Sequence, residues 1–358
     1  MRKSFPVLAV VLVLLAGLIC LYGLTAYLGI QPRVRATQAL RAAAEAARMS
    51  AVTLPPQAPP APKGYPDGAS VVEALKTGEL TLVDLEVATP PDVIESRDLE
   101  YGRVGGHSLR LDLYQPAWRS GRTVPGLVFV HGGAWSSGSR QSYRRHAVRQ
   151  ARRGYVAASI SYRLPDEAPF PAAIEDVRSA VRWLRVRAPE YGMDPGAIGV
   201  VGSSAGGYLA MMTGYAAGVP ELDGSGGETN VSGAVSVVVT FCGAFDLGAE
   251  RVRDLPAVRR FIGERVYEEA SAAYREASPS TYLRAGAPPT LVLHGTIDEV
   301  VAITQADALA RRLLELGVPF TYDRLDGWPH AFDLAEAVRP RCEFMVDWFL
   351  DRHLPLRR

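Results

Sequence analysis

Short apolar runs alternate with amphipathic stretches along the chain from about residue 80 onward. The apolar runs are rich in β-branched residues, as expected of strands that are buried on both faces. Residues 99–104 and 108–114 form two such runs around a short turn and predict an antiparallel pair. Further strands are predicted at residues 126–130, 155–162, 198–201, 231–241, 290–294 and 320–325.

Helical periodicity separates these predicted strands. Residues 171–187 carry apolar side chains at helical spacing, and residues 304–316 and 342–350 continue the alternation. Strands joined by helices of this length predict an α/β fold, with a mostly parallel central sheet and helices on both faces. Such sheets bind ligands beyond the carboxyl ends of their strands, so polar residues that directly follow a strand are the first candidates for chemistry.

Residues 244–288 interrupt this alternation. They are charged and irregular, and they lie between two late strands of the predicted sheet. Two interpretations are open: a lid or substrate-shaping insertion, or a surface excursion without a role.

The N-terminal region differs in composition from the rest of the chain. Residues 5–30 contain no charged side chain and are almost all apolar, a run long enough to span the roughly 30 Å core of a bilayer. A single-pass transmembrane anchor is predicted; a cleaved signal peptide, with its usual apolar region of about 7–15 residues, is the alternative. Because a long domain crosses the membrane largely regardless of flanking charge, we expect the rest of the chain to be extracytoplasmic.

Residues 31–79 connect the predicted anchor to an α/β domain assigned to residues 80–358. The alanine-rich stretch at residues 36–49 predicts a short helix. Residues 54–62 are proline-rich and favour extended polyproline geometry, which predicts a semi-rigid spacer, with a disordered tether as the alternative.

Charge and cysteine content narrow the function classes. The net charge of this 358-residue chain is +1, so no strong field favours nucleic acid, and we expect no nucleic-acid partner. Three cysteines are too few for a disulfide framework, which leaves one bridge between Cys242 and Cys342 open. The sequence gives no indication of oligomeric state.

A small-residue turn follows the predicted strand at residues 198–201. Its sequence is Gly-Ser-Ser-Ala-Gly, with Ser204 at the centre, and an apolar helical stretch comes next. Small residues at Gly202 and Gly206 allow a strand to turn sharply into a helix and to expose the Ser204 hydroxyl, as in a nucleophile elbow. Serine is a poor nucleophile alone, so the motif predicts a base, an acid and an oxyanion site elsewhere in the chain.

The base and the acid are expected late in the chain, in the order serine, acid, histidine. His330 follows the last predicted strand and precedes the last predicted helix, which makes it the candidate base. Asp298 follows the strand at residues 290–294 and is the candidate acid; Glu299 is its competitor, and a simple helix-capping role is the alternative. His294, at the end of that strand, is expected to be structural.

A His-Gly-Gly loop follows the predicted strand at residues 126–130. Successive glycines let backbone N–H groups approach a developing oxyanion, so Gly132 and Gly133 are candidate donors together with Ala205. An ordinary Gly-Gly turn is the alternative. His131 is expected to orient this loop rather than to act as a base.

These motifs resemble the α/β-hydrolase superfamily, and more narrowly the esterases and lipases with a His-Gly-Gly oxyanion loop. That group includes hormone-sensitive-lipase-like and feruloyl-esterase-like carboxylesterases. The resemblance implies the α/β-hydrolase fold, a triad of Ser204, Asp298 and His330, and the oxyanion donors named above. Two departures, Ala134 where the former relatives have a third glycine and Ser203 where they often carry aspartate, favour the feruloyl-esterase-like branch.

The resulting hypothesis is a membrane-anchored serine carboxylesterase that acts on small-molecule esters through an acyl-enzyme, with no metal or organic cofactor. Trp135 and Trp328 are expected to flank the substrate pocket. Two alternatives remain: a peptidase or amidase of the prolyl-oligopeptidase type, and a non-catalytic hydrolase-like binding module.

Overall fold

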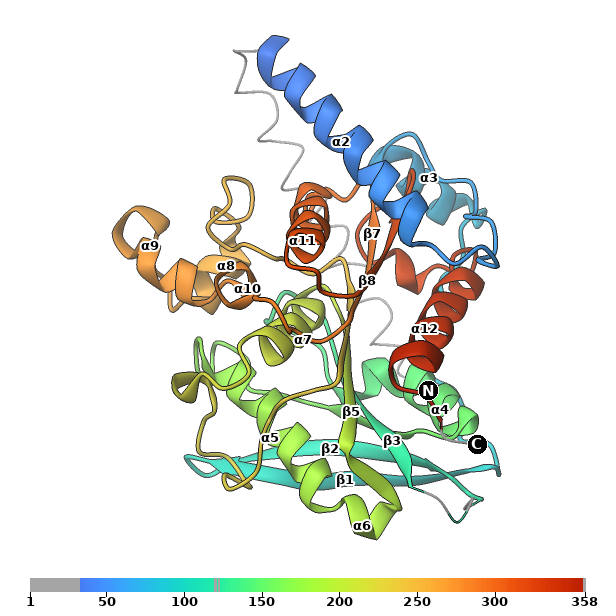
Figure 1. The fold of residues 1–358 in the computed structure, drawn as a ribbon, viewed down its shortest axis with the longest axis vertical. Coiled ribbons are helices and arrows are strands. Elements are labelled where there is room, and N and C mark those ends of the chain that lie inside the picture. Colours follow the sequence, from blue (N-terminus) through green and yellow to red (C-terminus); the bar gives the residue numbers. More distant parts are fainter. Residues whose placement is uncertain (1–32, 119–120, 122, 357–358) are drawn as a thin grey trace, which may run out of the picture.

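The computed structural model describes residues 33–118, 121 and 123–356 (Figure 1). Its central sheet has eight strands in the order β1-β2-β4-β3-β5-β6-β7-β8. The strands are β1 (Val93–Val104), β2 (His107–Pro116), β3 (Val124–Val130), β4 (Val156–Ile160), β5 (Met193–Ser203), β6 (Val237–Phe241), β7 (Thr290–Gly295) and β8 (Phe320–Leu325). β2 pairs antiparallel with β1 and β4, whereas every pair from β4 to β8 is parallel. The prediction of a mostly parallel sheet is confirmed.

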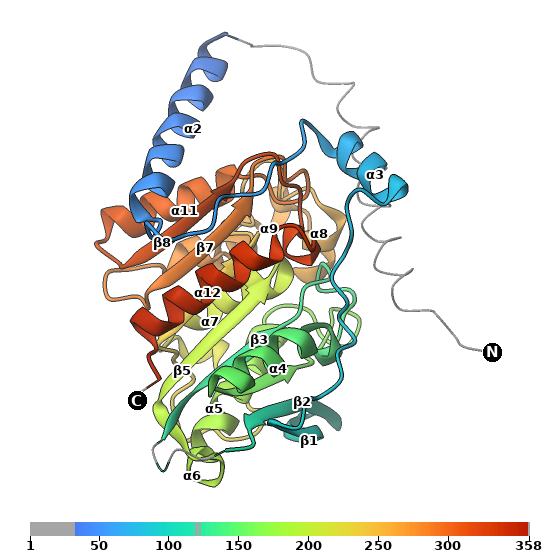
Figure 2. The same cartoon turned by 90° about the vertical axis from the view of Figure 1, so that its right-hand side faces the viewer.

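Helices cover both faces of this sheet (Figure 2). One face packs against α4 (Arg144–Arg153), α12 (Arg339–His353) and α3 (Gly68–Thr77). The other packs against α5 (Ala172–Val186), α7 (Ala205–Tyr215) and α11 (Thr304–Glu315). The remaining helical elements are α2 (Arg33–Thr53), α6 (Ala188–Tyr191), α8 (Pro256–Phe261), α9 (Tyr267–Glu276), α10 (Pro279–Tyr282), η1 (Arg140–Tyr143), η2 (Pro220–Leu222) and η3 (Phe332–Leu334).

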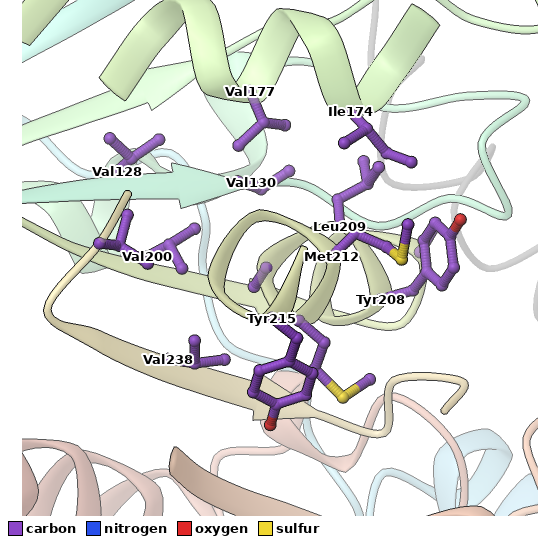
Figure 3. Packing of buried hydrophobic residues seen from close by; sticks show 14 of the residues in the cluster. Val128, Val130, Ile174, Val177, Val200, Tyr208, Leu209, Met212, Tyr215 and Val238 are labelled. Atoms are coloured by element: carbon purple, nitrogen blue, oxygen red, sulfur yellow. The ribbon is translucent and has the colours of Figure 1, made fainter. Parts of the chain in front are cut away.

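Helix α7, which follows the small-residue turn, is buried along its whole length. Figure 3 shows Leu209 of α7 directed toward Ile174 of α5, with Met212 and Val177 in the same buried cluster. All four side chains are fully buried, and burying each contributes about 1.5–3 kcal/mol. This packing fixes the helix whose first turn forms the candidate site.

Strand β6 is shorter than the sequence predicts. The apolar run suggests a strand over residues 231–241, but β6 begins at Val237. Arg185 of α5 donates hydrogen bonds to the carbonyl oxygens of Ser232 and Ala234. A side chain therefore satisfies backbone groups that a strand would pair with its neighbour, and the strand prediction is wrong for residues 231–236.

Residues 244–288 form the short helices α8, α9 and α10, which lie together at one side of the molecule (Figure 1). Phe261 at the end of α8 is buried and contacts the chain near the small-residue turn. The segment is therefore packed onto the domain rather than extended away from it.

The C-terminal end of helix α2 lies at the free edge of β8, the last strand of the sheet. Thr53 Oγ1 accepts a hydrogen bond from Tyr322 N at 3.0 Å, and Ser50 Oγ accepts one from Arg324 N at 3.2 Å. These hydroxyls satisfy amide groups that an edge strand otherwise exposes. Among the described residues no helix is both long and apolar enough to cross a bilayer. The anchor predicted at residues 5–30 lies outside the described residues.

The proline-rich segment at residues 54–62 lies on the α/β domain, whereas the sequence predicts a semi-rigid spacer. The indole Nε1 of Trp328 donates to the carbonyl oxygen of Pro62 at 3.1 Å, and Arg341 donates to that of Pro59. Leu54 and Ala58 pack against the buried cluster beneath α12. Proline carbonyls accept hydrogen bonds as well as any others, so an extended segment without its own hydrogen bonds can still dock.

Candidate active site

Ser204 stands at the turn between β5 and α7. Its backbone has φ 55° and ψ −121°, a left-handed φ that costs a non-glycine residue on the order of 1–3 kcal/mol. Two hydrogen bonds hold this conformation: Ser204 N donates to Phe241 O at 2.8 Å, and Tyr208 N donates to Ser204 O at 2.9 Å. The strain exposes the hydroxyl at the start of α7.

The glycines beside Ser204 are required by close backbone approaches. A Cβ at Gly202 would lie 2.2 Å from Gly206 O, and one at Gly206 would lie 2.0 Å from Val130 O. No side chain fits either gap, because the first turn of α7 is pressed against β3 and β5. The spacing that the sequence shows is thus imposed by the fold.

The structure brings Ser204, His330 and Asp298 into one hydrogen-bonded row. Ser204 Oγ donates to His330 Nε2 at 2.8 Å, and His330 Nδ1 donates to Asp298 Oδ2 at 2.7 Å. Both distances are those of ordinary strong hydrogen bonds. Asp298 follows β7 and His330 follows β8, so all three residues lie beyond the carboxyl ends of parallel strands.

The surroundings of Asp298 keep it ionised. Its Oδ1 accepts from the backbone N–H groups of Val300 at 2.9 Å and Val301 at 2.8 Å, and His294 Nε2 lies 3.1 Å from Oδ2. Burial alone would raise the pKa of this carboxyl, but His330 and His294 outweigh it and hold the pKa well below its usual value. A charged acceptor at Oδ2 fixes the proton of His330 on Nδ1 and leaves Nε2 free to accept from serine.

The contact between Asp298 and His330 also sets the pKa of the His330 imidazole. Burial would lower the pKa of His330, but the Asp298 carboxylate outweighs burial and holds that pKa above its usual value. A positive charge on the ring is therefore stabilised when His330 takes up a proton. Glu299, the competing acid, is exposed, and its carboxylate lies against the first residue of α3, Gly68.

The glycine loop lies directly against the serine. A Cβ at Gly132 would be 3.3 Å from Ser204 Cβ, and Gly133 has a φ of 108° that favours glycine. Among the described residues, the N–H groups of Gly132, Gly133 and Ala205 donate no backbone hydrogen bond outside regular elements. Ala134 has a φ of 52°, a position where glycine carries no steric penalty.

His131 supports that loop from within the core. Its ring stacks on Tyr162 with centroids 4.3 Å apart, and Tyr162 Oη donates to His131 O at 3.0 Å. Burial lowers the pKa of His131 to about 4, so the ring is neutral and its Nδ1 donates to Gly132 O at 2.8 Å. His131 thus lies where it orients the loop.

The two tryptophans have different environments. Trp135 stacks on Phe261 at 4.5 Å and meets Tyr208, one turn after Ser204, edge to face at 5.1 Å. Trp328 is 1% exposed and its indole faces the N-terminal segment through Pro62 and Tyr65. The expectation that Trp328 flanks the substrate pocket is therefore corrected, because its side chain is buried in the hydrophobic cluster with α3 and α12.

Cys242 lies beside the hydrogen-bonded row of Ser204, His330 and Asp298, although the sequence does not place it at the site. Its Sγ, an oxygen of Asp298 and a ring nitrogen of His330 all lie within 4.8 Å of one another. Sulfur, nitrogen and oxygen donors of this kind suit Zn²⁺, yet here the histidine and the carboxylate already bond each other. Cys242 and Cys342 are both buried and free, so the bridge that the sequence leaves open is not formed.

A second buried carboxylate lies beneath the elbow. Ser203 Oγ donates to Asp333 Oδ1 at 3.2 Å, although the two residues are 130 positions apart. Burial raises the pKa of Asp333. The sequence shows Ser203 only as a departure from the aspartate that hormone-sensitive-lipase relatives often carry; the structure shows that Ser203 is bonded to a carboxylate from another loop.

The sequence model of the BD-FAE family matches residues 111–313, which is more than half of the chain. The chain belongs to the BD-FAE family. The match places it among the α/β-hydrolase esterases and lipases, as the motifs predict. The matched interval of this BD-FAE chain contains Ser204 and Asp298 and ends before His330.

Curated relatives of the BD-FAE chain include esterases. Esterase LipQ of Mycobacterium tuberculosis is 32% identical over 283 residues, covering 77% of this chain and 66% of LipQ. Esterase LipC of the same organism is 33% identical over 235 residues, covering 64% of this chain and 58% of LipC. The chain thus matches about three-fifths to two-thirds of the length of these relatives.

Solved structures show the same architecture. Thermogutta terrifontis esterase 2, in a form phosphoramylated by tabun, has a TM-score of 0.64 and 27% identity. The similarity covers 77% of this chain and 100% of that structure. A propionate-bound form of that esterase has a TM-score of 0.63 and 29% identity, covering 75% of this chain and 97% of that structure.

Proposed function

We propose that this BD-FAE chain is a serine carboxylesterase that cleaves small-molecule esters through an acyl-enzyme. The observation that carries the proposal is the row of hydrogen bonds from Ser204 through His330 to Asp298. The esterase relatives support the ester as the bond cleaved.

In the first half of the reaction, Ser204 Oγ attacks the ester carbonyl while His330 Nε2 takes its proton. The oxyanion that forms is stabilised by the N–H groups of Gly132, Gly133 and Ala205, and Asp298 stabilises the imidazolium. His330 then returns the proton to the departing alcohol, and the C–O bond breaks to leave an acyl group on Ser204.

In the second half, water takes the place of the alcohol. His330 removes a proton from the water as it attacks the acyl carbonyl, and the same N–H groups bind the new oxyanion. Collapse of this intermediate releases the carboxylic acid, and the proton returns to Ser204 Oγ. Every proton thus moves through one ring nitrogen.

The acyl group is proposed to be short. Trp135 and Phe261 are stacked and buried, and both rings contact Tyr208, one turn after Ser204; we take this aromatic cluster as the boundary of the acyl site. The structurally similar Thermogutta terrifontis esterase 2 is described with propionate and with butyrate bound, which supports short chains here.

The decisive experiment compares two adjacent serines of the elbow. Fluorophosphonate labelling and p-nitrophenyl acetate turnover are measured for Ser204→Ala and for the control Ser203→Ala. Losing Ser204 is expected to abolish labelling and to lower kcat by on the order of 10⁴ or more, whereas Ser203→Ala is still labelled. A Ser204→Ala protein that is labelled and fully active would overturn the proposal.

We also propose that residues 5–30 anchor the enzyme in a membrane with the α/β domain on the extracytoplasmic side. The support is the uncharged apolar run itself. The full chain is expected to stay with membranes after alkaline carbonate washing, whereas a chain without residues 1–30 is released. Protease digestion of sealed vesicles tests the side. Release of the intact full-length chain by carbonate would exclude the anchor.

A further inference from the structure

The loop that carries His330 runs from the end of β8 to the start of α12. It meets the N-terminal part of the chain on both sides of the histidine, first at Gly327 and Trp328 and again at Leu334. Figure 2 shows the part of this N-terminal stretch that joins α2 to α3 passing along the side of the molecule that holds β8 and α12. The contact at Leu334 is made by Val83, which follows α3.

The upstream contact is close and directional. Tyr65 N donates to Gly327 O at 2.7 Å, and Trp328 Nε1 donates to Pro62 O at 3.1 Å across 266 positions of sequence. The rings of Tyr65 and Trp328 meet edge to face with centroids 5.7 Å apart. A Cβ at Gly64 would lie 2.2 Å from Asp326 O, so the two backbones touch with no room for a side chain.

The downstream contact is a short antiparallel pairing. Leu82 and Ala335 form a β-bridge, flanked by hydrogen bonds from Val83 N to Leu334 O at 2.8 Å and from Glu336 N to Thr81 O at 2.9 Å. His330 is therefore held between two sets of backbone contacts, both made by residues that precede the BD-FAE match.

The upstream contact also reaches the loop of the acid. Trp328 O accepts a hydrogen bond from Ile297 N at 3.2 Å, and Gly327 N donates to Thr296 Oγ1 at 2.8 Å. Ile297 directly precedes Asp298. Trp328 is therefore linked to both loops of the proposed base and acid: it lies two residues before His330 and bonds the residue before Asp298.

We propose that residues 62–83 form a clamp that holds the His330 loop in the position where His330 bonds Ser204 and Asp298. The clamp is a positioning element of the active site and touches no reacting atom. This inference rests on the proposed function, because it gives His330 the part of the base.

The clamp has to hold the two hydrogen-bond distances of His330 within a few tenths of an ångström. His330 Nε2 lies 2.8 Å from Ser204 Oγ, and its Nδ1 lies 2.7 Å from Asp298 Oδ2. Hydrogen bonds of this type extend only to about 3.2 Å, and misplacing a reacting group by about 1 Å can cost on the order of 10²-fold in rate. A loosened clamp is therefore expected to lower turnover before it unfolds the protein.

Two variants of the full chain test this. Gly64→Ala forces Asp326 and Gly327 to move, and Trp328→Phe removes the bond to Pro62 but keeps an aromatic ring. Matched controls are Gly196→Ala, whose new Cβ would meet only Asp194 Oδ1 at 3.3 Å, and Trp348→Phe on α12.

The clamp variants are expected to lose kcat and kcat/KM equally for p-nitrophenyl acetate, because the contact matters only while the proton moves. The loss is expected to be about tenfold or more for Gly64→Ala and about threefold to tenfold for Trp328→Phe. Both controls are expected to stay within about twofold of the parent chain. Circular dichroism and thermal melting establish that each variant is folded at the assay temperature.

The pH dependence of kcat/KM distinguishes a clamp that positions His330 from a segment that only stabilises the fold. A looser contact with Asp298 raises the pKa of His330 less, so the acid limb of kcat/KM is expected to move to lower pH in the clamp variants alone. Folded variants with the parent kcat and the parent acid limb would overturn the clamp. If Gly64→Ala does not fold, Trp328→Phe decides the matter. Failure of the proposed function is distinguishable, since the parent chain itself would then show no labelling and no turnover.

Discussion

Replacing Asp298 by asparagine tests the electrostatics of the proposed triad with almost no change of shape. The amide oxygen can still accept from the backbone N–H groups of Val300 and Val301. The amide NH₂ then faces His330 Nδ1, which has to become an acceptor, so the ring proton moves to Nε2. That proton points at Ser204 Oγ, and the ring can no longer take the serine proton.

The size of the effect follows from the geometry. In the transition state His330 carries a positive charge next to the Asp298 carboxylate, with the charge centres about 4 Å apart, an attraction of about 4 kcal/mol at an effective dielectric constant near 20. Losing it costs roughly 10³-fold, since 1.36 kcal/mol corresponds to tenfold. The wrong tautomer of His330 lowers the rate further. We therefore expect kcat/KM of Asp298→Asn to fall by about 10³–10⁴-fold.

The assay is hydrolysis of p-nitrophenyl acetate across the pH range, with Glu299→Gln as the matched control. Glu299 is exposed and lies toward α3, so its loss is expected to change kcat/KM by less than about threefold. Any residual activity of Asp298→Asn should have its acid limb at lower pH, because the carboxylate that raises the pKa of His330 is gone. A loss below about tenfold, or equal losses in both variants, would refute the assignment of the acid.

Three further predictions follow from the surrounding residues. Ala134→Gly relieves a left-handed φ of 52° and is expected to raise the free energy of unfolding by about 1 kcal/mol in urea titrations; a destabilised variant would show that the strain is not steric. Burial raises the pKa of Asp333 in the folded state, so its ionisation opposes folding at neutral pH and not below about pH 4. Asp333→Asn is therefore expected to raise Tm at pH 7, with a gain that vanishes toward pH 4, and an equal gain at both values would contradict this. Phe261→Ala is expected to cost about 3–5 kcal/mol of stability and to raise kcat/KM for hexanoate relative to acetate esters; an unchanged ratio across an acyl panel would show that Phe261 does not limit the acyl site.

The sequence predicts the parts of the site that depend on local geometry. The glycines around Ser204 leave a pattern because backbone contacts allow no other residue at Gly202 and Gly206. Asp298 and His330 could be found because each follows a strand that the apolar pattern shows, in a fixed order along the chain. These signals are local, and the fold then brings the three residues together.

Other features depend on which way a side chain faces, and the sequence does not contain that information directly. Trp328 is two residues before the histidine, yet its indole turns toward Pro62 and away from the site. Ser203 and Asp333 meet across 130 positions, and nothing in either local pattern joins them. The proline-rich segment reads as a spacer because its own composition cannot reveal the loop against which it docks.

The hydroxyls of Ser50 and Thr53 on α2 accept hydrogen bonds from amide groups of β8, and this contact also determines how the protein can be shortened. Without Ser50 and Thr53, the N–H groups of Tyr322 and Arg324 would be unpaired at the open margin of the sheet. Such a margin recruits strands from other molecules, which leads to self-association and aggregation. A fragment that starts near residue 70 would retain the residues of the proposed triad and yet lose its colloidal stability.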